Sequence, residues 1–359
     1  MKSKPSTAKT QNVLLINLGS PAEVILSVPA IRRLREERPD ARLSMLVYNP
    51  MADIADDLPF LEKTIALKDR EYGRSPLRRL RRLGEIVREN VTVIKNLRRA
   101  RFGTAINFGG SWHGALIALL CRAGLKAGCR SNLLSRFLNV KLDKVPNRHK
   151  LQEHLDLVKA LGVASVSGAE GLHRLRVAAE DRRFVADFLA LNDVGKRDLL
   201  IGLDPSAPDP DDRWDRGYIA LLADRLAQGL GCKVVIMGDI EDLFYVREML
   251  SLMKSRPVVA TGKLCLGQVK ALAARCSLIA ATNAGTVHLS SGVGTKVIFL
   301  HRSGNFLGWR PLGKKDVVVS AQMPYRPNGR SNSGGLDRAK DMVVDNVVSV
   351  AQFQLKNEP

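Results

Sequence analysis

The sequence predicts an α/β protein with two doubly wound domains, each built on a parallel sheet. Short apolar runs alternate with amphipathic stretches along most of the chain, which is the pattern of strand–helix–strand units. The chain has 359 residues, enough for two domains of about 100–200 residues, and a second series of such units begins in its second half. We therefore expect a disordered basic tail, an N-terminal domain, a linker helix, a C-terminal domain and a final helix, over residues 1–11, 12–178, 179–196, 197–338 and 339–359.

The first series opens on the apolar run Asn12–Asn17, which Gly19 and Ser20 separate from a helical pattern at Ala22–Arg38. A strand, a glycine turn and a helix in this order begin an α/β unit. Further along, apolar residues three or four positions apart predict a helix over Pro76–Arg101. The other elements expected in this half are strands at Arg42–Tyr48, Ile65–Leu67 and Thr104–Phe108, and helices at Trp112–Ala123 and Leu151–Leu161.

The second series follows a helix expected at Glu180–Asn192, between the two domains. Strands and helices then alternate, with strands at Leu199–Leu203, Cys232–Met237, Ser277–Ala281 and Thr295–Leu300, and helices at Trp214–Gly229, Ile240–Met253, Leu266–Cys276 and Val287–Gly292. Residues 302–338 are rich in Gly, Pro and Arg and are expected to be mostly loop, and Asp341–Leu355 is expected to form the last helix. Two such domains are expected to face each other across a central cleft.

The turn after the first strand carries a candidate functional carboxylate, Glu23. In open parallel sheets, ligands bind at the carboxyl ends of the strands. Glu23 lies just inside a helix N-terminus, where the helix dipole stabilises a negative charge and is expected to keep the side chain ionised. The alternative interpretation is an acidic first-turn residue with no other role.

The turn Asn283-Ala284-Gly285-Thr286 predicts an anion site at a second helix N-terminus. Gly285 lets the backbone approach a ligand, and the Thr286 hydroxyl adds a donor. The alternative is that Asn283 only caps the helix. His288 lies one turn further and either faces the same site or packs in the core.

The loop Asp204–Trp214 follows another strand and mixes both charges. Ser206 and Arg213 are candidate phosphate contacts, whereas three aspartates would repel a phosphate: Asp209, Asp211 and Asp212. Acidic clusters also suit a divalent cation, but this spacing matches no EF-hand loop. A helix-capping role for Asp212 or Asp215 is the simpler interpretation, and we expect no metal here.

The charge of the chain predicts an anionic partner. There are 56 Lys and Arg against 36 Asp and Glu, a formal net charge of +20. Residues 68–101 hold twelve basic and four acidic residues, with four arginines on one helical turn: Arg78, Arg79, Arg81 and Arg82. Only Tyr72 in this segment could stack on a base, so an anionic leaflet or a phosphorylated acceptor fits better than nucleic acid. A solvated basic face is the alternative.

Several classes of protein are disfavoured by what the sequence does not contain. The five cysteines are odd in number and have no C-x-x-C spacing, which argues against a disulfide framework or a Cys-rich zinc site and points inside the cell. We expect no signal peptide, and no apolar run reaches the 18 or so residues of a membrane span. No G-x-G-x-x-G follows the first strand, and the P-loop, H-E-x-x-H and G-x-S-x-G motifs are absent.

From about Asn12 to Gly313 the chain resembles the family 9 glycosyltransferases, the lipopolysaccharide heptosyltransferases, which have the two-Rossmann GT-B architecture. The resemblance rests on the order and spacing of several stretches rather than on one motif. These are NVLLINLGSPAEVILSVPAIRRLREERPDARL, then RFGTAINFGGSWHGALIALLCRAGLKAG, then GDIE at Gly238–Glu241, which is similar to the family's G-x-x-E, and finally TGKLCLGQVKALAARCSLIAATNAGTVHLSSGVGTKVIFL.

This resemblance implies a function and a location. The family transfers a heptose from an ADP-sugar to the lipopolysaccharide inner core, with inversion and usually without metal, so we expect no cofactor. It implies an N-terminal acceptor domain, a C-terminal donor domain, and a cytoplasmic protein that is peripheral on the inner face of the plasma membrane. The implied partners are a nucleotide-sugar, a phosphorylated glycolipid acceptor and the anionic leaflet, but not nucleic acid.

The resemblance also assigns roles to residues. Glu23 stands where the family has an Asp general base, and Glu241 matches a Glu that contacts the donor ribose. Gly285, Thr286 and His288 match the loop around the donor diphosphate and sugar. In the implied reaction Glu23 deprotonates the acceptor hydroxyl, and the helix start at Gly285, with Arg213 or Arg302, stabilises the leaving diphosphate.

Three positions depart from the family pattern, which keeps other functions open. Glu23 replaces an Asp, Asp212 stands in place of a phosphate-binding Lys, and Asn283 replaces the Asp of the family's D-T-G. The main alternative is a catalytically silent GT-B relative that binds an anionic glycan or a protein partner. A basic nucleic-acid binder is a third possibility, which steep salt dependence of binding to nonspecific DNA would support.

Overall fold

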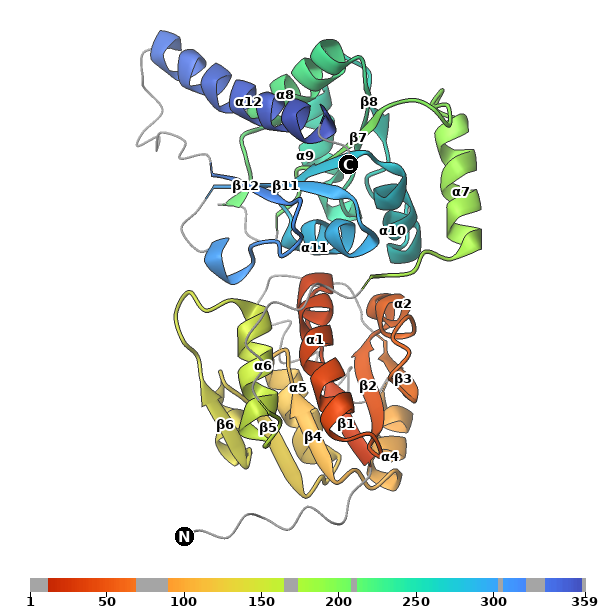
Figure 1. The fold of residues 1–359 in the computed structure, drawn as a ribbon, viewed down its shortest axis with the longest axis vertical. Helices are drawn as coiled ribbons and strands as arrows, with labels where there is room; N and C mark the ends of the chain where they lie inside the picture. Colours follow the sequence, from red (N-terminus) through yellow and green to blue (C-terminus); the bar gives the residue numbers. More distant parts are fainter. Residues whose placement is uncertain are drawn as a thin grey trace. The chain divides into compact units, whose positions relative to one another are not determined.

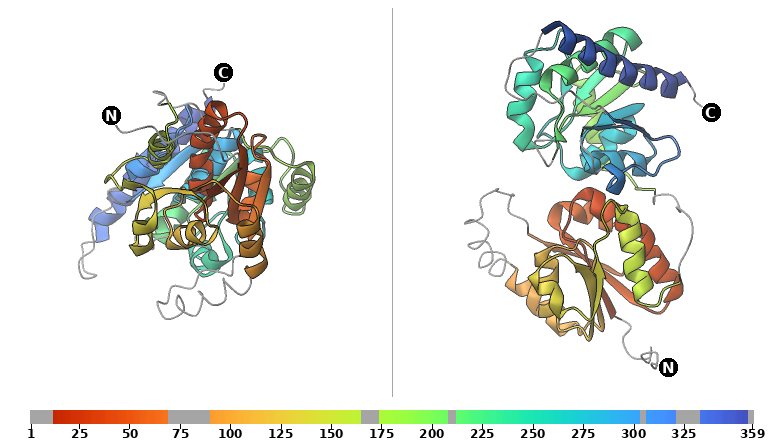
Figure 2. Two further views of the ribbon diagram at one scale, coloured as in Figure 1. Left: turned by 90° about the horizontal axis from the view of Figure 1, so that it is seen from below. Right: turned by 90° about the vertical axis from the view of Figure 1, so that its left-hand side faces the viewer.

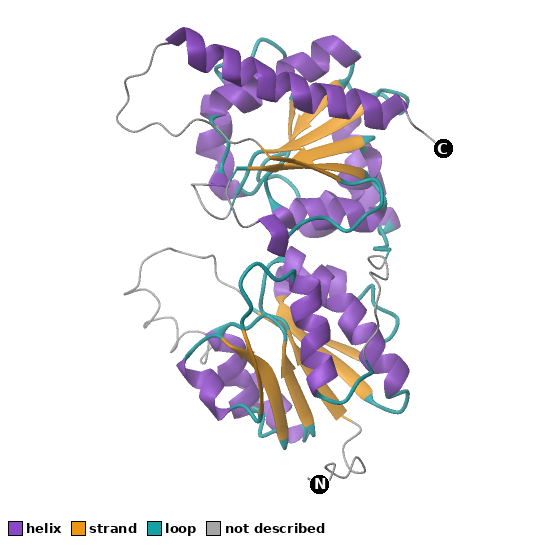
Figure 3. Ribbon diagram, turned by 60° about the vertical axis from the view of Figure 1, so that its left-hand side comes forward, coloured by secondary structure: helices purple, strands orange, loops and turns teal. Residues whose placement is uncertain are grey.

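The structure, a computed structural model, describes residues 12–68, 90–164, 174–207, 212–302, 306–320 and 333–356. Contacts divide the chain into two compact units, Met1–Glu170 and Gly171–Pro359. Each unit holds a six-stranded sheet flanked by helices (Figure 1; Figure 3). All strand pairs are parallel, so the expected α/β class with two parallel sheets is confirmed.

The sheet of the first unit has the strand order β3-β2-β1-β4-β5-β6. Its strands are β1 (Asn12–Ile16), β2 (Arg42–Tyr48), β3 (Lys63–Leu67), β4 (Thr104–Asn107), β5 (Leu125–Arg130) and β6 (Val140–Asp143). The helices are α1 (Pro21–Glu37), α2 (Ala52–Ala55), α4 (Val91–Arg99), α5 (Trp112–Leu120) and α6 (Lys150–Ala160), with single 3₁₀ turns η1 (Asn49–Met51) and η2 (Leu133–Phe137). The order reverses between β1 and β4, and the two turns that leave these strands diverge there, as at the ligand sites of open α/β sheets.

Helices cover both faces of this first sheet (Figure 2). On one face α1 packs against α6, and the Arg38 guanidinium at the end of α1 donates to the Leu161 carbonyl at the end of α6 over 2.7 Å. On the other face, Leu14 and Ile16 of β1 join a buried cluster with Leu97 of α4 and Ile117 of α5. Alternate residues of one strand thus enter two cores, which explains why the run reads as continuously apolar.

The sheet of the second unit has the order β12-β11-β10-β7-β8-β9. Its strands are β7 (Leu200–Asp204), β8 (Lys233–Ile236), β9 (Val258–Val259), β10 (Leu278–Ala281), β11 (Lys296–His301) and β12 (Val317–Ser320). The helices are α7 (Ala179–Ala190), α8 (Arg216–Leu230), α9 (Leu243–Leu250), α10 (Leu266–Arg275), α11 (Ala284–Val293) and α12 (Ser333–Lys356), with 3₁₀ turns η4 (Ile240–Asp242) and η5 (Phe306–Gly308). Here the order reverses between β7 and β10.

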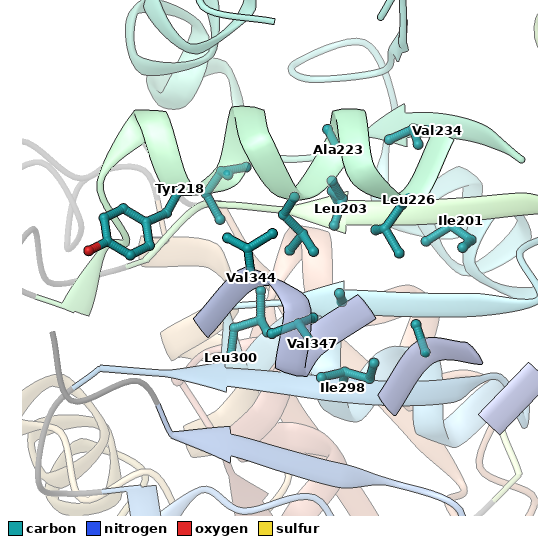
Figure 4. Packing of buried hydrophobic residues seen from close by; sticks show 14 of the residues in the cluster. Ile201, Leu203, Tyr218, Ala223, Leu226, Val234, Ile298, Leu300, Val344 and Val347 are labelled. Carbon is teal, nitrogen blue, oxygen red and sulfur yellow. The ribbon is translucent and has the colours of Figure 1, made fainter. Parts of the chain in front are cut away.

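Two separate cores sandwich the second sheet. Ile201 and Leu203 of β7 face α8, α9 and α12, where Leu226, Val344 and Val347 pack among them (Figure 4). Leu200 of β7 faces the opposite way, toward the cluster that contains residues of α7, α10 and α11. Because both faces are buried, β7 is held rigidly, and its carboxyl end at Asp204 has a fixed position.

The expected elements are present with shifted ends, and four strands were missed. β5, β6, β9 and β12 were not predicted, and β12 lies inside the segment 302–338 that we expected to be mostly loop. α11 begins at Ala284, earlier than Val287, because Asn283 caps it, and α9 ends at Leu250 rather than Met253. Of the helix expected at Pro76–Arg101, the described part forms α4, and residues 76–89 lie outside the described residues.

α7 lies in the segment 179–196 that we expected to link the domains, and it packs against α10 of the second unit. No helix in the described ranges has the length and apolar character that crossing a membrane requires.

Candidate active site

The second sheet brings two chemically rich turns together at its carboxyl edge. β7 ends at Asp204 and the neighbouring β10 ends at Ala281, directly before the turn that opens α11. The Thr282 N–H donates to the Asp204 carbonyl over 2.9 Å, so parallel pairing continues to the point where the chains diverge. Residues almost eighty positions apart in sequence therefore share one site.

Asp204 is the centre of a buried hydrogen-bond network at this edge. Its side chain is only 3% exposed. Oδ1 accepts from the Ser206 backbone N–H at 3.0 Å and from the Ser206 hydroxyl at 2.5 Å, and Oδ2 accepts from the Thr286 hydroxyl. Burial raises the pKa of the Asp204 carboxyl from 3.8 to about 6, although these hydrogen bonds oppose the shift.

The start of α11 is organised by the same network. The Asn283 side chain accepts from the Gly285 N–H at 2.8 Å and donates to the Ser206 hydroxyl at 3.0 Å. Asn283 is therefore the helix N-cap, the alternative weighed from the sequence, and it also ties α11 to β7. We expected the Gly285 N–H and the Thr286 hydroxyl to point to a ligand. Here the first is held by Asn283 and the second by Asp204.

Arg213 and a buried carboxylate form a second cluster beside this network. Arg213 Nη2 lies 2.5 Å from Asp242 Oδ1 in η4, and its guanidinium carbon lies 5.5 Å from the centre of the Tyr245 ring. The Tyr245 hydroxyl donates to the Trp214 carbonyl over 2.7 Å, and Arg302 donates to the Arg213 carbonyl over 2.9 Å. The predicted phosphate contact Arg213 is thus held by Asp242, Tyr245 and Arg302, which all lie outside its own loop.

The other residues predicted for this unit differ in exposure. Glu241 is exposed on η4, one residue before Asp242. His288 is fully buried, and its Nε2 lies 3.0 Å from the Trp309 carbonyl oxygen. Of the two interpretations of His288, the packed histidine is therefore the one that the structure supports. Asp215 caps α8 by accepting from the Gly217 N–H over 2.9 Å, as the simpler interpretation of the acidic loop anticipated.

In the first unit, Glu23 folds back over the start of its own helix. Glu23 Oε2 accepts from the Ser20 N–H at 3.3 Å, while the Ser20 hydroxyl accepts from the Glu23 N–H at 3.4 Å, which is a capping box. A β-carbon at position 19 would overlap this carboxylate, so a side chain there would displace Glu23 from its present position. Glu23 thus stabilises the first turn of α1, as one of the two interpretations expected. Its other carboxylate oxygen, Oε1, takes no part in the capping box.

Burial shifts the pKa of Glu23. The helix dipole was expected to keep this carboxylate ionised, and burial acts in the opposite direction by raising its pKa above the ordinary value. The nearby charge of Lys150, the Ser20 N–H and Lys144 lower the pKa in part. Lys150 opens α6, which packs against α1, and its ammonium lies 2.7 Å from Glu153 Oε2. A carboxyl whose pKa is raised by burial is a stronger base than an exposed one and is suited to taking a proton, and the charge of Lys150 moderates this shift.

Sequence reasoning missed three residues that organise these edges: Asp204, Asp242 and Lys150. Asp204 had a readable signal, because it ends an apolar strand at the edge where ligands bind.

The arginines Arg78, Arg79, Arg81 and Arg82, predicted to contact acceptor or membrane, lie outside the described residues. Within the described part of the chain, no group of three or more His, Cys, Asp or Glu side chains is placed to hold a metal.

Comparison with solved structures identifies the architecture of the protein. A solved glycosyltransferase family 9 protein from Veillonella parvula matches with a TM-score of 0.77 at 20% identity, over 97% of both chains. The Escherichia coli ADP-heptose lps heptosyltransferase II matches with a TM-score of 0.74 at 18% identity, over 96% of this chain and 98% of that one. The architecture is therefore GT-B, with two Rossmann-like domains, as the resemblance implied.

The family follows from the sequence. The profile of glycosyltransferase family 9 (heptosyltransferase) matches residues 91–334, about two thirds of the chain, so the protein belongs to this family of glycosyltransferases. Lipopolysaccharide heptosyltransferase 3 of Escherichia coli K12 is 22% identical over 315 residues, which cover 85% of this chain and 87% of that protein.

Proposed function

We propose that the protein transfers a heptose from ADP-heptose, with inversion, onto a lipopolysaccharide inner-core or related glycan acceptor. The donor is suggested by the named substrate of the Escherichia coli structural relative, and the acceptor by the name of the curated relative. The single observation that carries the proposal is the network at the start of α11, where Asp204, Ser206 and Asn283 hold a helix N-terminus in place beside Arg213. Such a helix start favours an anionic diphosphate.

The proposed reaction is a single displacement. The acceptor hydroxyl oxygen bonds to the anomeric carbon while the bond from that carbon to the diphosphate oxygen breaks, which inverts the anomeric configuration. Positive charge develops on the sugar and negative charge on the leaving diphosphate. Glu23 is the proposed base for the hydroxyl proton, and the helix start of α11 with Arg213 or Arg302 is proposed to stabilise the leaving group without a metal.

The proposed location is the cytoplasmic face of the inner membrane, where the protein would bind peripherally. The arginines at positions 78–82 are proposed to contact the anionic leaflet or the phosphorylated acceptor. The net charge of +20 supports an anionic surface as partner.

The test is acceptor-dependent release of ADP. The purified protein is incubated with ADP-heptose and with lipopolysaccharide from a strain that lacks inner-core heptose, and the glycolipid is then examined by mass spectrometry. We expect the acceptor to gain one heptose and ADP to appear only when both substrates are present. If the acceptor binds but no ADP-, GDP-, UDP- or dTDP-sugar is consumed, the catalytically silent alternative is the better account.

A further inference from the structure

The buried Asp204–Thr286 pair has two possible hydrogen-bond arrangements. In the ionised state Asp204 only accepts, so the single proton of the Thr286 hydroxyl is directed into the protein. In the protonated state Asp204 carries a proton of its own, which it can donate to Thr286 Oγ1. The Thr286 proton is then available to another acceptor. Thr286 is half-buried in the first turn of α11, so a ligand at the surface can reach this residue.

The surrounding charges favour easy protonation of this carboxyl. Of the charged groups on the neighbouring elements, Asp242 of η4 acts on Asp204 and disfavours its ionised form. Arg213, from the loop after β7, is paired with Asp242, and His288 of α11 lies against the Trp309 carbonyl instead. Ser206 and Thr286 stabilise the anion by hydrogen bonds, yet burial outweighs them, so the pKa of Asp204 is raised to about 6.

We propose that Asp204 is a positioning residue of the donor site, which takes up a proton when a nucleotide-sugar binds at the start of α11 and thereby turns the Thr286 hydroxyl toward the diphosphate. This inference rests on the proposed function, because it places a diphosphate at that helix start. The proton comes from solvent and moves to Asp204 Oδ2, and no covalent bond of the ligand changes. Two hydrogen bonds are exchanged, since Thr286 accepts from Asp204 and donates to the ligand.

The direction of the coupling follows from charge. The diphosphate of a nucleotide-sugar is a diester without a titratable proton near neutral pH, so its negative charge is constant. A second negative charge beside Asp204 favours the neutral carboxyl. Proton uptake is therefore expected from the protein and not from the ligand. By linkage, the affinity of the protein for the donor must fall as pH rises above neutral.

Isothermal titration calorimetry of ADP-heptose, without acceptor, measures this coupling. Titrations in buffers of different ionisation enthalpy give the number of protons taken up between pH 5 and pH 9. We expect uptake of about 0.5–1 proton near pH 7, and less toward both ends of the range. Asp204→Asn should abolish the uptake. Thr286→Val should reduce it near pH 7, because the lost hydrogen bond leaves more of Asp204 protonated before the donor binds, whereas Thr286→Ser keeps the hydroxyl and should retain the uptake.

Asp204→Asn separates positioning from mere structural support. The Asn amide can donate permanently to Thr286 Oγ1, as protonated Asp204 would. The variant should therefore bind ADP-heptose with an affinity independent of pH, and at pH 9 more tightly than the parent. A residue needed only for folding would instead weaken binding at every pH when replaced.

Asp316→Asn is the matched control. Asp316 is a carboxylate with a raised pKa that accepts from the Ser291 hydroxyl over 2.6 Å near the other end of α11. Its replacement should leave the proton uptake unchanged. Binding of ADP-heptose with no uptake, or with equal uptake in Asp204→Asn, overturns the inference and leaves the proposed function standing. If ADP-heptose and the GDP-, UDP- and dTDP-sugars all fail to bind, both are overturned.

Discussion

The Thr286 hydroxyl at the start of α11 donates to the carboxylate of Asp204 at the end of β7, across 82 positions of sequence. This contact joins the end of β7 to the helix that follows β10, and the strand order of the second sheet reverses between β7 and β10. The site is thus built from a strand end that is buried on both faces and a helix start that is tied to it by side chains. The backbone of such a site is held in place before any ligand binds, which is the basis of electrostatic preorganisation.

Asp204 makes the stability of the protein depend on pH. Its pKa rises from an ordinary 3.8 to about 6 in the folded state, so folding stabilises the protonated form. This contribution is fully present below about pH 4 and is lost as pH rises through 6, and a shift of this size corresponds to roughly 3 kcal/mol.

The measurement compares the parent with Asp204→Asn, which does not titrate. Urea denaturation at fixed pH should show the free energy of unfolding of the parent falling relative to the variant between pH 4 and pH 7. Glu180→Gln changes an exposed carboxylate on α7 and should show no such trend. A constant difference between parent and Asp204→Asn would mean that the carboxyl does not titrate in this window.

The sequence predicts the site at the carboxyl end of β7 only in part. The reason is that the residues in contact there lie far apart along the chain. The loop after β7 and the turn before α11 were both singled out, because each follows an apolar run. That Asp204 binds Thr286 could not be derived, since the contact exists only because β10 pairs with β7. No local pattern specifies which strands become neighbours.

Three of the four missed strands, β6, β9 and β12, have a different cause. β6 (VKLD) alternates half-buried and exposed positions at an edge of its sheet, and β9 has two residues. β12 (VVVS) is an edge strand inside a Gly- and Pro-rich segment. Strands at sheet edges bury fewer side chains, so their apolar signal is short and weak. The buried central strands β1, β7 and β10, in contrast, were predicted nearly to the residue because both of their faces are apolar.

Glu241 provides a test of the donor-ribose assignment. The side chain is exposed on η4, so Glu241→Ala should not change folding. Loss of one charge-assisted hydrogen bond, worth about 1.5–3 kcal/mol, should weaken nucleotide-sugar binding about 10- to 150-fold. Calorimetry measures the affinity, and Glu180→Ala on α7 is the control of equal charge change. Unchanged affinity would remove Glu241 from the donor site.

The arginine cluster at residues 78–82 is testable without a structure of that segment. Each basic residue near an anionic surface contributes about 1 kcal/mol, so replacing Arg78, Arg79, Arg81 and Arg82 by Gln should release the protein from anionic vesicles at low salt. The control replaces four exposed arginines of the second unit, Arg174, Arg176, Arg183 and Arg197. Equal loss in both variants would indicate that only net charge matters.

Lys150 should set the acidic limb of the pH–rate profile. Its charge is the largest of the influences that lower the pKa of Glu23 against burial. Lys150→Met removes this charge, so the pKa of Glu23 should rise further and the base should be protonated over more of the pH range. Turnover measured from pH 5 to pH 9 should therefore fall first at the acidic end, with the limb displaced to higher pH. Lys159→Met at the exposed end of α6 should leave the limb in place.

Glu23→Gln tests the base itself, and the capping box makes it a clean variant. A glutamine at this position can also accept from the Ser20 N–H, so helix α1 should keep its cap and stability should change by no more than about 0.5 kcal/mol. Because an amide cannot take a proton, turnover should fall by about 10²–10⁴ while donor affinity stays the same. Full activity would leave the cap as the only role of Glu23.

Two companion variants divide the structural role of this carboxylate from the chemical one. Ser20→Ala removes the other half of the capping box and should cost about 0.5–2 kcal/mol of stability, yet the folded fraction should keep its turnover because the carboxylate remains.

Glu23→Asp shortens the side chain by one C–C bond, about 1.5 Å. A displacement near 1 Å can cost about 100-fold in rate, so Asp should be the worse catalyst here although the family uses it. An Asp variant that is as fast as the parent would show that the reach of Glu23 is not part of the site. In that case the Ser20 cap would fix the position of α1 and not that of the base.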